Sequence, residues 1–299
     1  MFEEIRQASA EGQGKAVKAL CGMTGTSRAT YYRWRRPRPA SAAAMQVRDQ
    51  IQRIALEFPS YGYRRITAEL QRRNWKVNHK RVLRMMREDN LLCLRRKCFL
   101  VTSDSRHVLP VYPNVAQAMT PEAVNQLWVA DITYIRLRVE FVYLAVILDA
   151  YSRRVIGWAL GRRLEAELAL SALRMALGER RPRPGLVHHS DRGVQYACRA
   201  YTDLLQQHEA VISMSRRGNP YDNALAEAFM KTLKYEEVYR SDYRDAADAY
   251  ACIGEFIESV YNAKRLHSAL GYRPPTEFER LADRQQNSNS SQRPNLGGC

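Results

Sequence analysis

The fold is decided by residues 128–160, which read WVADITYIRLRVEFVYLAVILDAYSRRVIGWAL. Residues 128–135 predict a first strand. Residues 141–148 are eight consecutive apolar residues, which is typical of a strand buried on both faces. Residues 154–160 predict a third strand. Because short turns join them, the three strands should form a meander.

The residues that follow alternate between helical and strand patterns. The expected elements are a helix, a strand, a helix, a strand and two final helices, at residues 165–177, 186–189, 199–208, 211–214, 224–235 and 246–261. The order βββαβαβα predicts an α/β fold with a mixed sheet covered by helices on both sides. Residues 282–299 are rich in Asn, Ser and Gln and are expected to be disordered.

The sequence before the sheet is helical and basic. Residues 16–21 and 27–35 predict two short helices around a five-residue turn, which is helix-turn-helix spacing. The second helix mixes cations with aromatic rings, which suits phosphates and base edges, so DNA contacts are expected from Arg28, Tyr31 and Arg33. The alternative is a solvated basic helix whose aromatic rings pack internally.

A second helical group is expected at residues 45–58, 64–73 and 79–89. Asn78 is a suitable N-cap for the last of these helices. That helix has a basic face and an apolar face, formed by Lys80, Arg84 and Arg87 and by Val82, Met85 and Met86. The arrangement predicts a tri-helical DNA-binding domain with the last helix as reader. A structural helix with a solvated cationic face is the alternative.

The positive charge of the chain is concentrated in this helical region. The 299 residues include 47 Lys and Arg against 31 Asp and Glu, a formal charge of +16. Residues 1–110 carry a net +14 and the remainder only +2. A segregated excess marks a surface for a polyanion, whereas a uniform excess would serve solubility.

Composition argues against several other classes of protein. Hydrophobic residues make up 45% and charged residues 26% of the chain, as in an ordinary folded protein. The six cysteines form no CxxC pair and have no histidine at zinc-finger spacing, so no disulfide or zinc framework is expected. No apolar run is long enough for a membrane span, and residues 1–4 contain acids where a secretory signal would be basic. A reduced, cytoplasmic environment is therefore expected.

Three carboxylates occupy positions that are hard to explain structurally. Asp131 lies inside the first strand, where an ionised group is costly to bury without a compensating partner. Asp191 follows the short strand 186–189, at the sheet edge where open α/β sheets usually bind ligands. Glu227 lies on the helix 224–235, on the face opposite its apolar stripe.

Each acid also has a structural explanation. Asp131 could pair with an arginine, Asp191 could be a turn residue, and Glu227 could pair with Lys231 one turn later. Asp149 is a rival acid, but it ends a strand just before a turn, which favours a turn-capping role. The 35 residues between Asp191 and Glu227, together with their placement on strand end and helix, favour a site shared with Asp131.

Five motifs occur in order between residues 61 and 278. They are YGYRRI at 61–66, WVADITY at 128–134, HSDRGVQY at 189–196, SMSRRGNPYDNA at 213–224 and YNAKRLHSALGY at 261–272. On these motifs the chain resembles the polynucleotidyl transferases with an Asp, Asp, 35-residue gap, Glu pattern, which include retroviral integrases and bacterial insertion-sequence transposases. It resembles in particular the second-frame (OrfB) protein of insertion-sequence family three.

The resemblance implies an RNase H-like core in which Asp131, Asp191 and Glu227 are catalytic and hold two Mg²⁺ ions, with Mn²⁺ as a substitute. Carboxylate oxygens are the ligands that Mg²⁺ prefers, and two ions suit an in-line displacement at phosphorus. Water would attack first at the ends of the element, and the freed 3′ hydroxyl would then join to target DNA. His188 and His189 point to opposite faces of a strand and cannot both serve one site, although His189 could support a ligand.

The implied partners are double-stranded DNA at the element ends and target, further copies of the chain in a synaptic homo-oligomer, and an upstream-frame protein. No membrane partner is implied, and the protein would act on the bacterial nucleoid. The expected DNA contacts are Arg28, Tyr31, Arg33, Arg64, Arg65, Lys80, Arg81, Arg84, Lys231 and Lys234. The zinc-binding module of retroviral integrases is missing from the sequence, and the basic helical domain takes its place.

The expected domains are a helix-turn-helix-like segment, a helical DNA-binding domain, a linker, an RNase H-like integrase core, a C-terminal helical extension and a disordered tail. Their expected limits are 1–40, 41–105, 106–122, 123–240, 241–280 and 281–299. Residues 218–222 are expected to act as a hinge. Two rival functions remain: a metal-dependent nuclease without strand transfer would share the three acids, and a non-catalytic DNA-binding regulator would use only the helical region.

Overall fold

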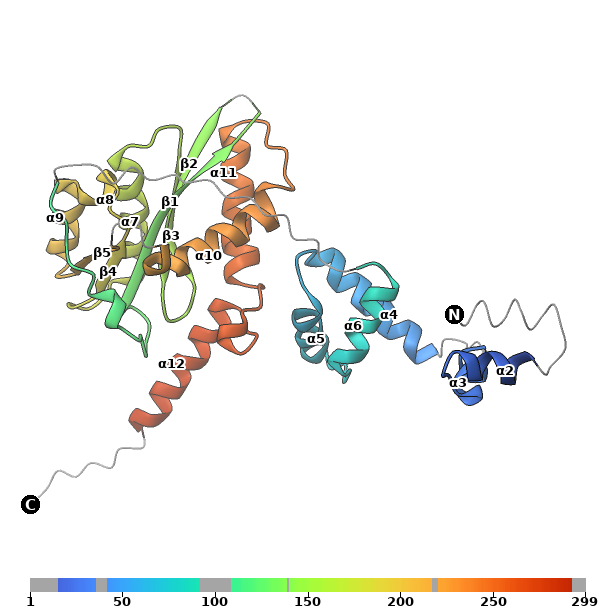
Figure 1. Ribbon diagram of the computed structural model, residues 1–299. Helices are drawn as coiled ribbons and strands as arrows, with labels where there is room; N and C mark the ends of the chain where they lie inside the picture. The colour runs from blue at the N-terminus through green and yellow to red at the C-terminus, as the bar shows by residue number, and fades with distance from the viewer. Residues whose placement is uncertain (1–15, 36–41, 92–108, 139, 217–219, 292–299) are drawn as a thin grey trace, which may run out of the picture. The chain divides into compact units, whose positions relative to one another are not determined.

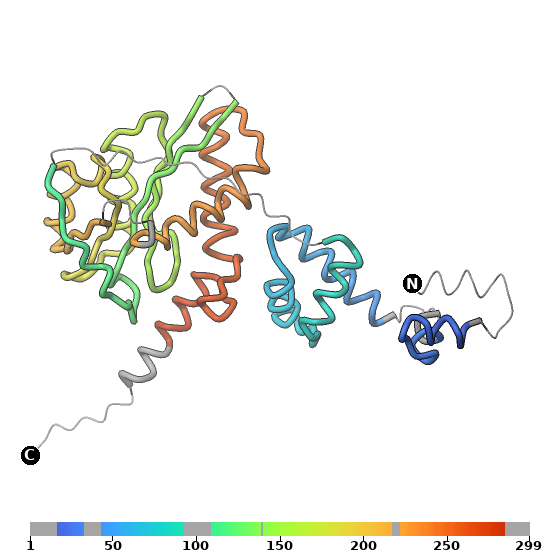
Figure 2. Tube along the Cα trace, in the orientation of Figure 1, coloured from blue at the N-terminus to red at the C-terminus, as the bar shows by residue number. Residues whose placement is uncertain are grey.

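The computed structural model describes residues 16–35, 42–91, 109–138, 140–216 and 220–291 (Figures 1 and 2). The chain divides into two compact units, Met1–Arg53 and Ile54–Cys299. Within the described ranges, no helix combines the length and the apolar character needed to cross a lipid bilayer.

The first unit contains α2 (Ala16–Met23), α3 (Arg28–Arg35) and the first part of α4 (Ala42–Glu57). A turn with Gly25 at a φ of +63° joins α2 to α3, as the helix-turn-helix spacing predicted. Tyr31 is fully buried and packs with Val17 and Cys21 in the small core of this pair. The prediction that Tyr31 contacts DNA is therefore wrong, because its ring fills the interior.

The second unit begins with the end of α4 and with α5 (Tyr63–Arg72) and α6 (His79–Glu88), which pack against each other. Asn78 is the N-cap of α6, as predicted, and its Oδ1 accepts a hydrogen bond from the Lys80 backbone N–H at 2.8 Å. The two faces of α6 are also as predicted. Its buried side chains are Val82, Met85 and Met86, and its exposed cations include Lys80, Arg81 and Arg84.

A five-stranded mixed sheet forms the centre of the second unit. Its strands are β1 (Leu127–Arg136), β2 (Phe141–Asp149), β3 (Val155–Gly161), β4 (Val187–Ser190) and β5 (Val211–Met214). The order across the sheet is β3-β2-β1-β4-β5; the first three are antiparallel, and β1, β4 and β5 are parallel. The α/β fold class, the meander and the order of elements are thus confirmed.

Helices cover both faces of this sheet (Figure 1). One face, with Trp128 and Ala130 of β1, packs against α7 (Ala166–Arg180) and α9 (Arg199–Gln207); the short α8 (Val194–Ala197) completes this layer. The other face, with Leu127 and Val129 of β1, packs against α10 (Ala224–Leu233) and α11 (Ala246–Glu255). The alternation along β1 gives each face its own hydrophobic core.

The C-terminal part departs from the sequence prediction in two ways. The helices α10 and α11 pass into π-helical segments, Lys234–Val238 and Phe256–Asn262. The expectation of disorder after residue 281 is wrong for residues 282–291, which continue α12 (Pro275–Ser291). Low helix propensity of Asn and Ser is a weak preference, and a helix already nucleated upstream can propagate through them. Residues 292–299 lie outside the described ranges.

Gly157 on β3 offers a test of how tightly the sheet packs against α7. A Cβ at this position would lie 2.3 Å from the Ala172 carbonyl oxygen and 2.8 Å from the Ala176 Cβ. Gly157→Ala should therefore lower the free energy of unfolding by about 1–3 kcal/mol or more, because backbone cannot yield as a side chain can. The urea midpoint of the full chain measures the change, with the fluorescence of Trp128 and Trp158 in the cores as the signal.

Gly178 on α7 is the matched control, since a Cβ there would meet nothing within 4 Å. Gly178→Ala should leave stability unchanged or raise it by up to about 1 kcal/mol, because alanine favours helix over glycine. Equal urea midpoints for the two variants would contradict the close packing of β3 on α7.

Candidate active site

Asp131 lies in the middle of β1, opposite Val146 of β2. Alternation along the strand puts its side chain on the same face as Leu127 and Val129, beneath α10. The side chain is half-buried, and Oδ1 accepts a hydrogen bond from the Ile132 backbone N–H at 2.9 Å. The expected position inside the first strand is observed.

Asp191 directly follows β4, which pairs in parallel with β1. Val129 is opposite His189 in this pairing, so Asp131 and Asp191 both lie two residues further along, on the same face. Oδ1 of Asp191 accepts a hydrogen bond from the Gly193 backbone N–H at 2.9 Å. The sheet register therefore brings these two acids together.

Glu227 lies in the first turn of α10, which packs on β1. Its side chain is half-buried, and Oε2 lies 3.3 Å from Nζ of the exposed Lys231. The pair predicted from the sequence thus exists, but an exposed i,i+4 pair contributes only a few tenths of a kcal/mol. It does not by itself explain the position of Glu227.

The electrostatics couple the three acids. The pKa of the Asp131 carboxyl is raised to about 8, first because the group is desolvated and then because Asp191 and Glu227 lie close enough to repel its charge. The Lys234 ammonium partly offsets this; it lies 4.9 Å from the centroid of the Tyr134 ring, and burial lowers its own pKa. The site therefore concentrates negative charge that the nearby protein cation does not balance.

This donor set suits a divalent cation. Carboxylate oxygens are hard ligands, and mutual repulsion among them is relieved when a cation binds. Within the described ranges, no three or more His, Cys, Asp or Glu side chains are already gathered at ligand spacing. The three acids fit the chemistry of a metal site and would have to draw closer around the ion.

Asn223, just before α10, was not singled out from the sequence. It is buried, and its Nδ2–H donates a hydrogen bond to the Ala130 carbonyl at 3.1 Å. This contact fixes the start of the Glu227 helix next to Asp131. Only the presence of Asn223 within the 213–224 motif could have pointed to it.

The loop before α10 is closed by an ion pair. The Asp222 carboxylate accepts hydrogen bonds from the backbone and guanidinium of Arg216, and this holds its pKa at about 2. The predicted hinge at 218–222 falls partly on residues 217–219, which lie outside the described ranges.

The other polar residues near the site have structural roles. Asp149 is buried and accepts hydrogen bonds from the backbone N–H groups of Asn125, Tyr151 and Ser152, which confirms the turn-capping interpretation. His188 and His189 point to different sides, as expected. They contact the Tyr201 hydroxyl and the hydroxyls of Ser213 and Ser215 respectively.

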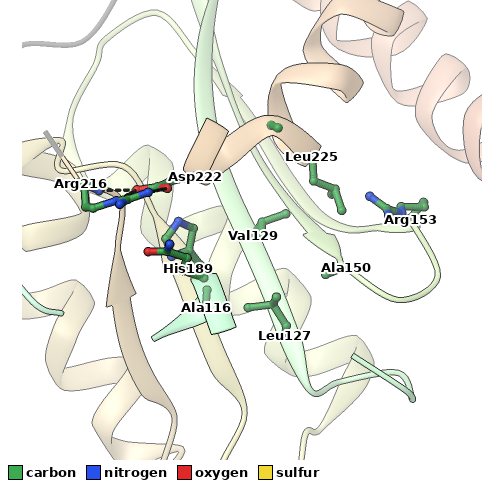
Figure 3. A pocket seen from close by; sticks show the side chains of 11 residues that line it. Ala116, Leu127, Val129, Ala150, Arg153, His189, Arg216, Asp222 and Leu225 are labelled. Atoms are coloured by element: carbon green, nitrogen blue, oxygen red, sulfur yellow. Dashed lines mark hydrogen bonds and ion pairs between the residues drawn. The ribbon is translucent and has the colours of Figure 1, made fainter. Parts of the chain in front are cut away.

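A cavity of about 470 Å³ lies beside the three acids, on the α10 side of β1. Figure 3 shows Leu127, Val129 and Ala150 along it, with the Arg216–Asp222 pair and Arg153 at opposite ends of the view. Of the described residues that line it, none is Asp131, Asp191 or Glu227. The three acids therefore do not form the wall of this cavity.

The predicted DNA-binding residues lie in different environments. Lys80, Arg81, Arg84, Lys231, Arg28 and Arg64 are exposed, Lys234 is half-buried beside Asp131, and the side chain of Arg33 lies outside the described part. Arg65 is different, because it is half-buried and its Nε–H donates to the Leu266 carbonyl. Its guanidinium therefore belongs to an internal contact rather than to an open surface.

Three stretches of the chain match known family models. Residues 43–99 match the HTH-like domain, and residues 121–220 and 208–275 match two models of the integrase core domain. The matches follow the division between basic helices and mixed sheet.

Two bacterial proteins align with most of the chain. The uncharacterized 31 kDa protein of insertion element IS600 from Shigella sonnei is 38% identical over 268 residues, which cover 87% of this chain and 97% of that protein. Transposase InsF for insertion sequence IS3A from Escherichia coli (strain K12) is 34% identical over 270 residues, covering 88% and 94%. Among solved structures, the HTLV-2 integrase catalytic core domain in complex with magnesium aligns with a TM-score of 0.42 at 14% identity, covering 54% of this chain and 99% of that one.

Proposed function

The chain belongs to the IS3 family of insertion-sequence transposases, and we propose that Asp131, Asp191 and Glu227 are the residues with which it cuts element ends and joins them to target DNA. The observation that carries this proposal is the coupling of the three acids. They come from a strand, a strand end and a helix. Burial, and then the charges of Asp191 and Glu227, raise the pKa of Asp131. An acid cluster of this kind is a candidate reaction centre.

Two Mg²⁺ ions, or Mn²⁺ in their place, would be held by Asp131, Asp191 and Glu227. When bound, they would supply activation of the attacking oxygen and stabilisation of the leaving 3′ oxygen. The chain's own residues prepare this site. The sheet register fixes Asp131 and Asp191, and the Asn223 contact with Ala130 holds the Glu227 helix beside them.

Lys234 completes the site on the substrate side. Its ammonium lies over the Tyr134 ring and near Asp131, where it would attract the phosphodiester that enters. Partial desolvation strengthens such an attraction relative to a fully solvated lysine. Neither cleavage of the element ends nor joining to target DNA needs a nucleophile from the protein, because water attacks in the first step and the 3′ hydroxyl in the second.

The basic helices would supply most of the affinity for DNA. If about ten phosphates are neutralised, a plot of log affinity against log salt should have a slope near −9. Lys80→Ala and Arg84→Ala on α6 should each make this slope shallower by about 1. Fluorescence anisotropy with duplex DNA at several salt concentrations measures the slope.

Arg174→Ala is the matched control for the salt measurement. Arg174 is an exposed cation on α7 that pairs with Glu167, and it lies outside the basic helices. Its removal should leave the slope unchanged. Equal changes of slope in Lys80→Ala, Arg84→Ala and Arg174→Ala would contradict the assignment of DNA binding to α6.

The test of the proposed reaction uses duplexes that end in the terminal repeats of the element, which flank the gene. Precut ends with a free 3′ hydroxyl are supplied with target DNA and Mg²⁺, and joined products are resolved by gel electrophoresis. Joining that requires Asp131, Asp191 and Glu227 is the expected result. Cleavage of uncut ends without any joining of precut ends would identify a nuclease instead.

A further inference from the structure

The backbone of Leu266 is bonded on both sides by side chains from the helical region. The Tyr61 hydroxyl accepts a hydrogen bond from the Leu266 N–H at 2.8 Å, and the Arg65 Nε–H donates one to the Leu266 carbonyl at 3.1 Å. Leu266 is fully buried, so these two side chains take the place that water would have. The partners are separated by 205 and 201 residues in sequence.

The helical side of this contact is held rigidly. Tyr61 is only 2% exposed, and its ring stacks on Phe58 with centroids 4.6 Å apart and planes at 11°. The Arg65 guanidinium lies 5.7 Å from the centroid of the same ring. Phe58, Tyr61 and Arg65 thus present one hydroxyl and one N–H in a fixed arrangement.

The other side is a closed segment of the C-terminal extension, residues 265–273. His267 and Arg273 form a β-bridge, and the Tyr272 N–H donates to the His267 carbonyl at 2.8 Å across a turn with Gly271 at a φ of +63°. This turn holds the neighbouring Leu266 backbone in place. A second contact lies nearby, where Arg72 of α5 pairs in a bidentate manner with Glu277 of α12.

The closed segment is tied to the helix that carries Glu227. Arg265 forms a bidentate ion pair with Glu236 at 2.9 and 2.7 Å, and both side chains are largely buried. Glu236 belongs to the π-helical segment that continues α10 without a break. A chain of direct contacts therefore runs from Tyr61 through Leu266 and Arg265 to the Glu227 helix.

We propose that residues 265–273 are the docking surface for the helix pair α5 and α6. Tyr61 and Arg65 are then positioning residues that set α6 relative to the three acids. The role of Arg65 follows from its bond to Leu266, whereas its neighbour Arg64 is exposed and donates to the adjacent Tyr63 hydroxyl. Arg64 faces solvent, whereas Arg65 faces the protein. This inference rests on the proposed function only for its effect on joining.

The docking itself is tested without DNA, by hydrogen exchange of the full chain with fragmentation that resolves single amides. In Tyr61→Phe the Leu266 amide should exchange about tenfold faster, the change expected from loss of one buried hydrogen bond. The amides of His267 and Tyr272 bond within the segment and should keep their rates. Unchanged exchange at Leu266 would overturn the docking.

Tyr63→Phe is the matched control, because Tyr63 belongs to the same motif and its hydroxyl bonds, among the described residues, to Arg64 rather than to Leu266. It should leave the Leu266 amide unchanged. If Tyr61→Phe also speeds exchange in β1 and β2, the variant has lost its fold. Arg65→Met is then the test variant in its place. Arg65→Met removes the donor to the Leu266 carbonyl; this weakens the docking that shields the Leu266 N–H and should speed exchange at Leu266 without changing exchange in β1 and β2.

The positioning role is tested with precut element ends and target DNA. Tyr61→Phe should bind ends within about twofold of the unmodified chain but join them at least about tenfold more slowly at saturating DNA, since misplacement of reactants costs rate rather than affinity. Tyr63→Phe should join normally. Faster exchange at Leu266 with unchanged joining would overturn the positioning role, and absence of joining in every protein, the unmodified chain included, would count against the proposed function alone.

Discussion

Asp191→Asn should reduce cleavage and joining by about a thousandfold or more while leaving the affinity for element-end DNA within about twofold. An amide oxygen is a poorer ligand than a carboxylate, and loss of roughly 4 kcal/mol of transition-state stabilisation corresponds to such a factor. The proposed DNA contacts on α6 do not include Asp191, so binding should survive. The amide variants of Asp131 and Glu227 should behave in the same way.

One control variant makes this result specific. Asp203→Asn on α9 removes a half-exposed acid that pairs with Arg199 and should leave both reactions unchanged. Retention of joining by Asp191→Asn would exclude the three acids as the reaction centre. Loss of joining by Asp203→Asn would show instead that general charge, and not the site, controls the rate.

Asp131→Asn and Asp149→Asn should have different effects on the stability of the fold. Asp131→Asn removes a group whose ionised form is opposed by burial and by Asp191 and Glu227, so the melting temperature should stay the same or rise. Asp149→Asn replaces one of two acceptor oxygens with an NH2 donor, which leaves at least one backbone N–H facing another donor, and should cost about 1–3 kcal/mol. Thermal unfolding of the DNA-free chain separates the functional acid from the structural one.

Glu236→Ala should lower the free energy of unfolding by about 3–5 kcal/mol, the largest effect expected for a substitution of a largely buried residue. Its partner Arg265 has a side chain only 6% exposed, and removing one member of a buried pair leaves the other charge unpaired. Arg65 would also repel the unpaired Arg265 charge. The two guanidinium groups already interact, since burial and then the charge of Arg265 lower the pKa of Arg65. Urea unfolding of the full chain measures the loss.

An exposed pair provides the contrast. Arg138 and Asp242 pair with side chains 62% and 70% exposed, and Asp242→Ala should cost less than about 1 kcal/mol. The double variant Glu236→Gln with Arg265→Met should recover much of the stability lost in Glu236→Ala, because no buried charge remains. Equal losses for Glu236→Ala and Asp242→Ala would contradict the burial of the first pair.

The sheet could be predicted from sequence because each strand has a strong local signature. The eight apolar residues at 141–148 indicate burial on both faces of the strand, and most of β2 is buried in the structure. The convergence of Asp131 and Asp191 followed from topology, since parallel neighbours end at one edge. Glu227 needed the family pattern, because an exposed helical Glu has no unusual local signal.

The errors concern residues whose partners are distant in sequence or hidden by packing. Tyr31 and Arg65 have the composition of DNA contacts, but one fills a small core and the other bonds to Leu266. Local pattern cannot tell whether a cation or aromatic ring on a helix faces solvent or another part of the chain. The continuation of α12 through residues 282–291 is a similar case, in which context overrode a weak propensity.

The contact between Tyr61 and Leu266 also orders events in time. A ribosome adds roughly 5–20 residues per second, so the 205 residues between these partners take about 10–40 s to synthesise. During that interval α5 is already synthesised while its docking surface does not yet exist. Tyr61 and Arg65 therefore wait for their Leu266 partner until almost the whole chain has been made.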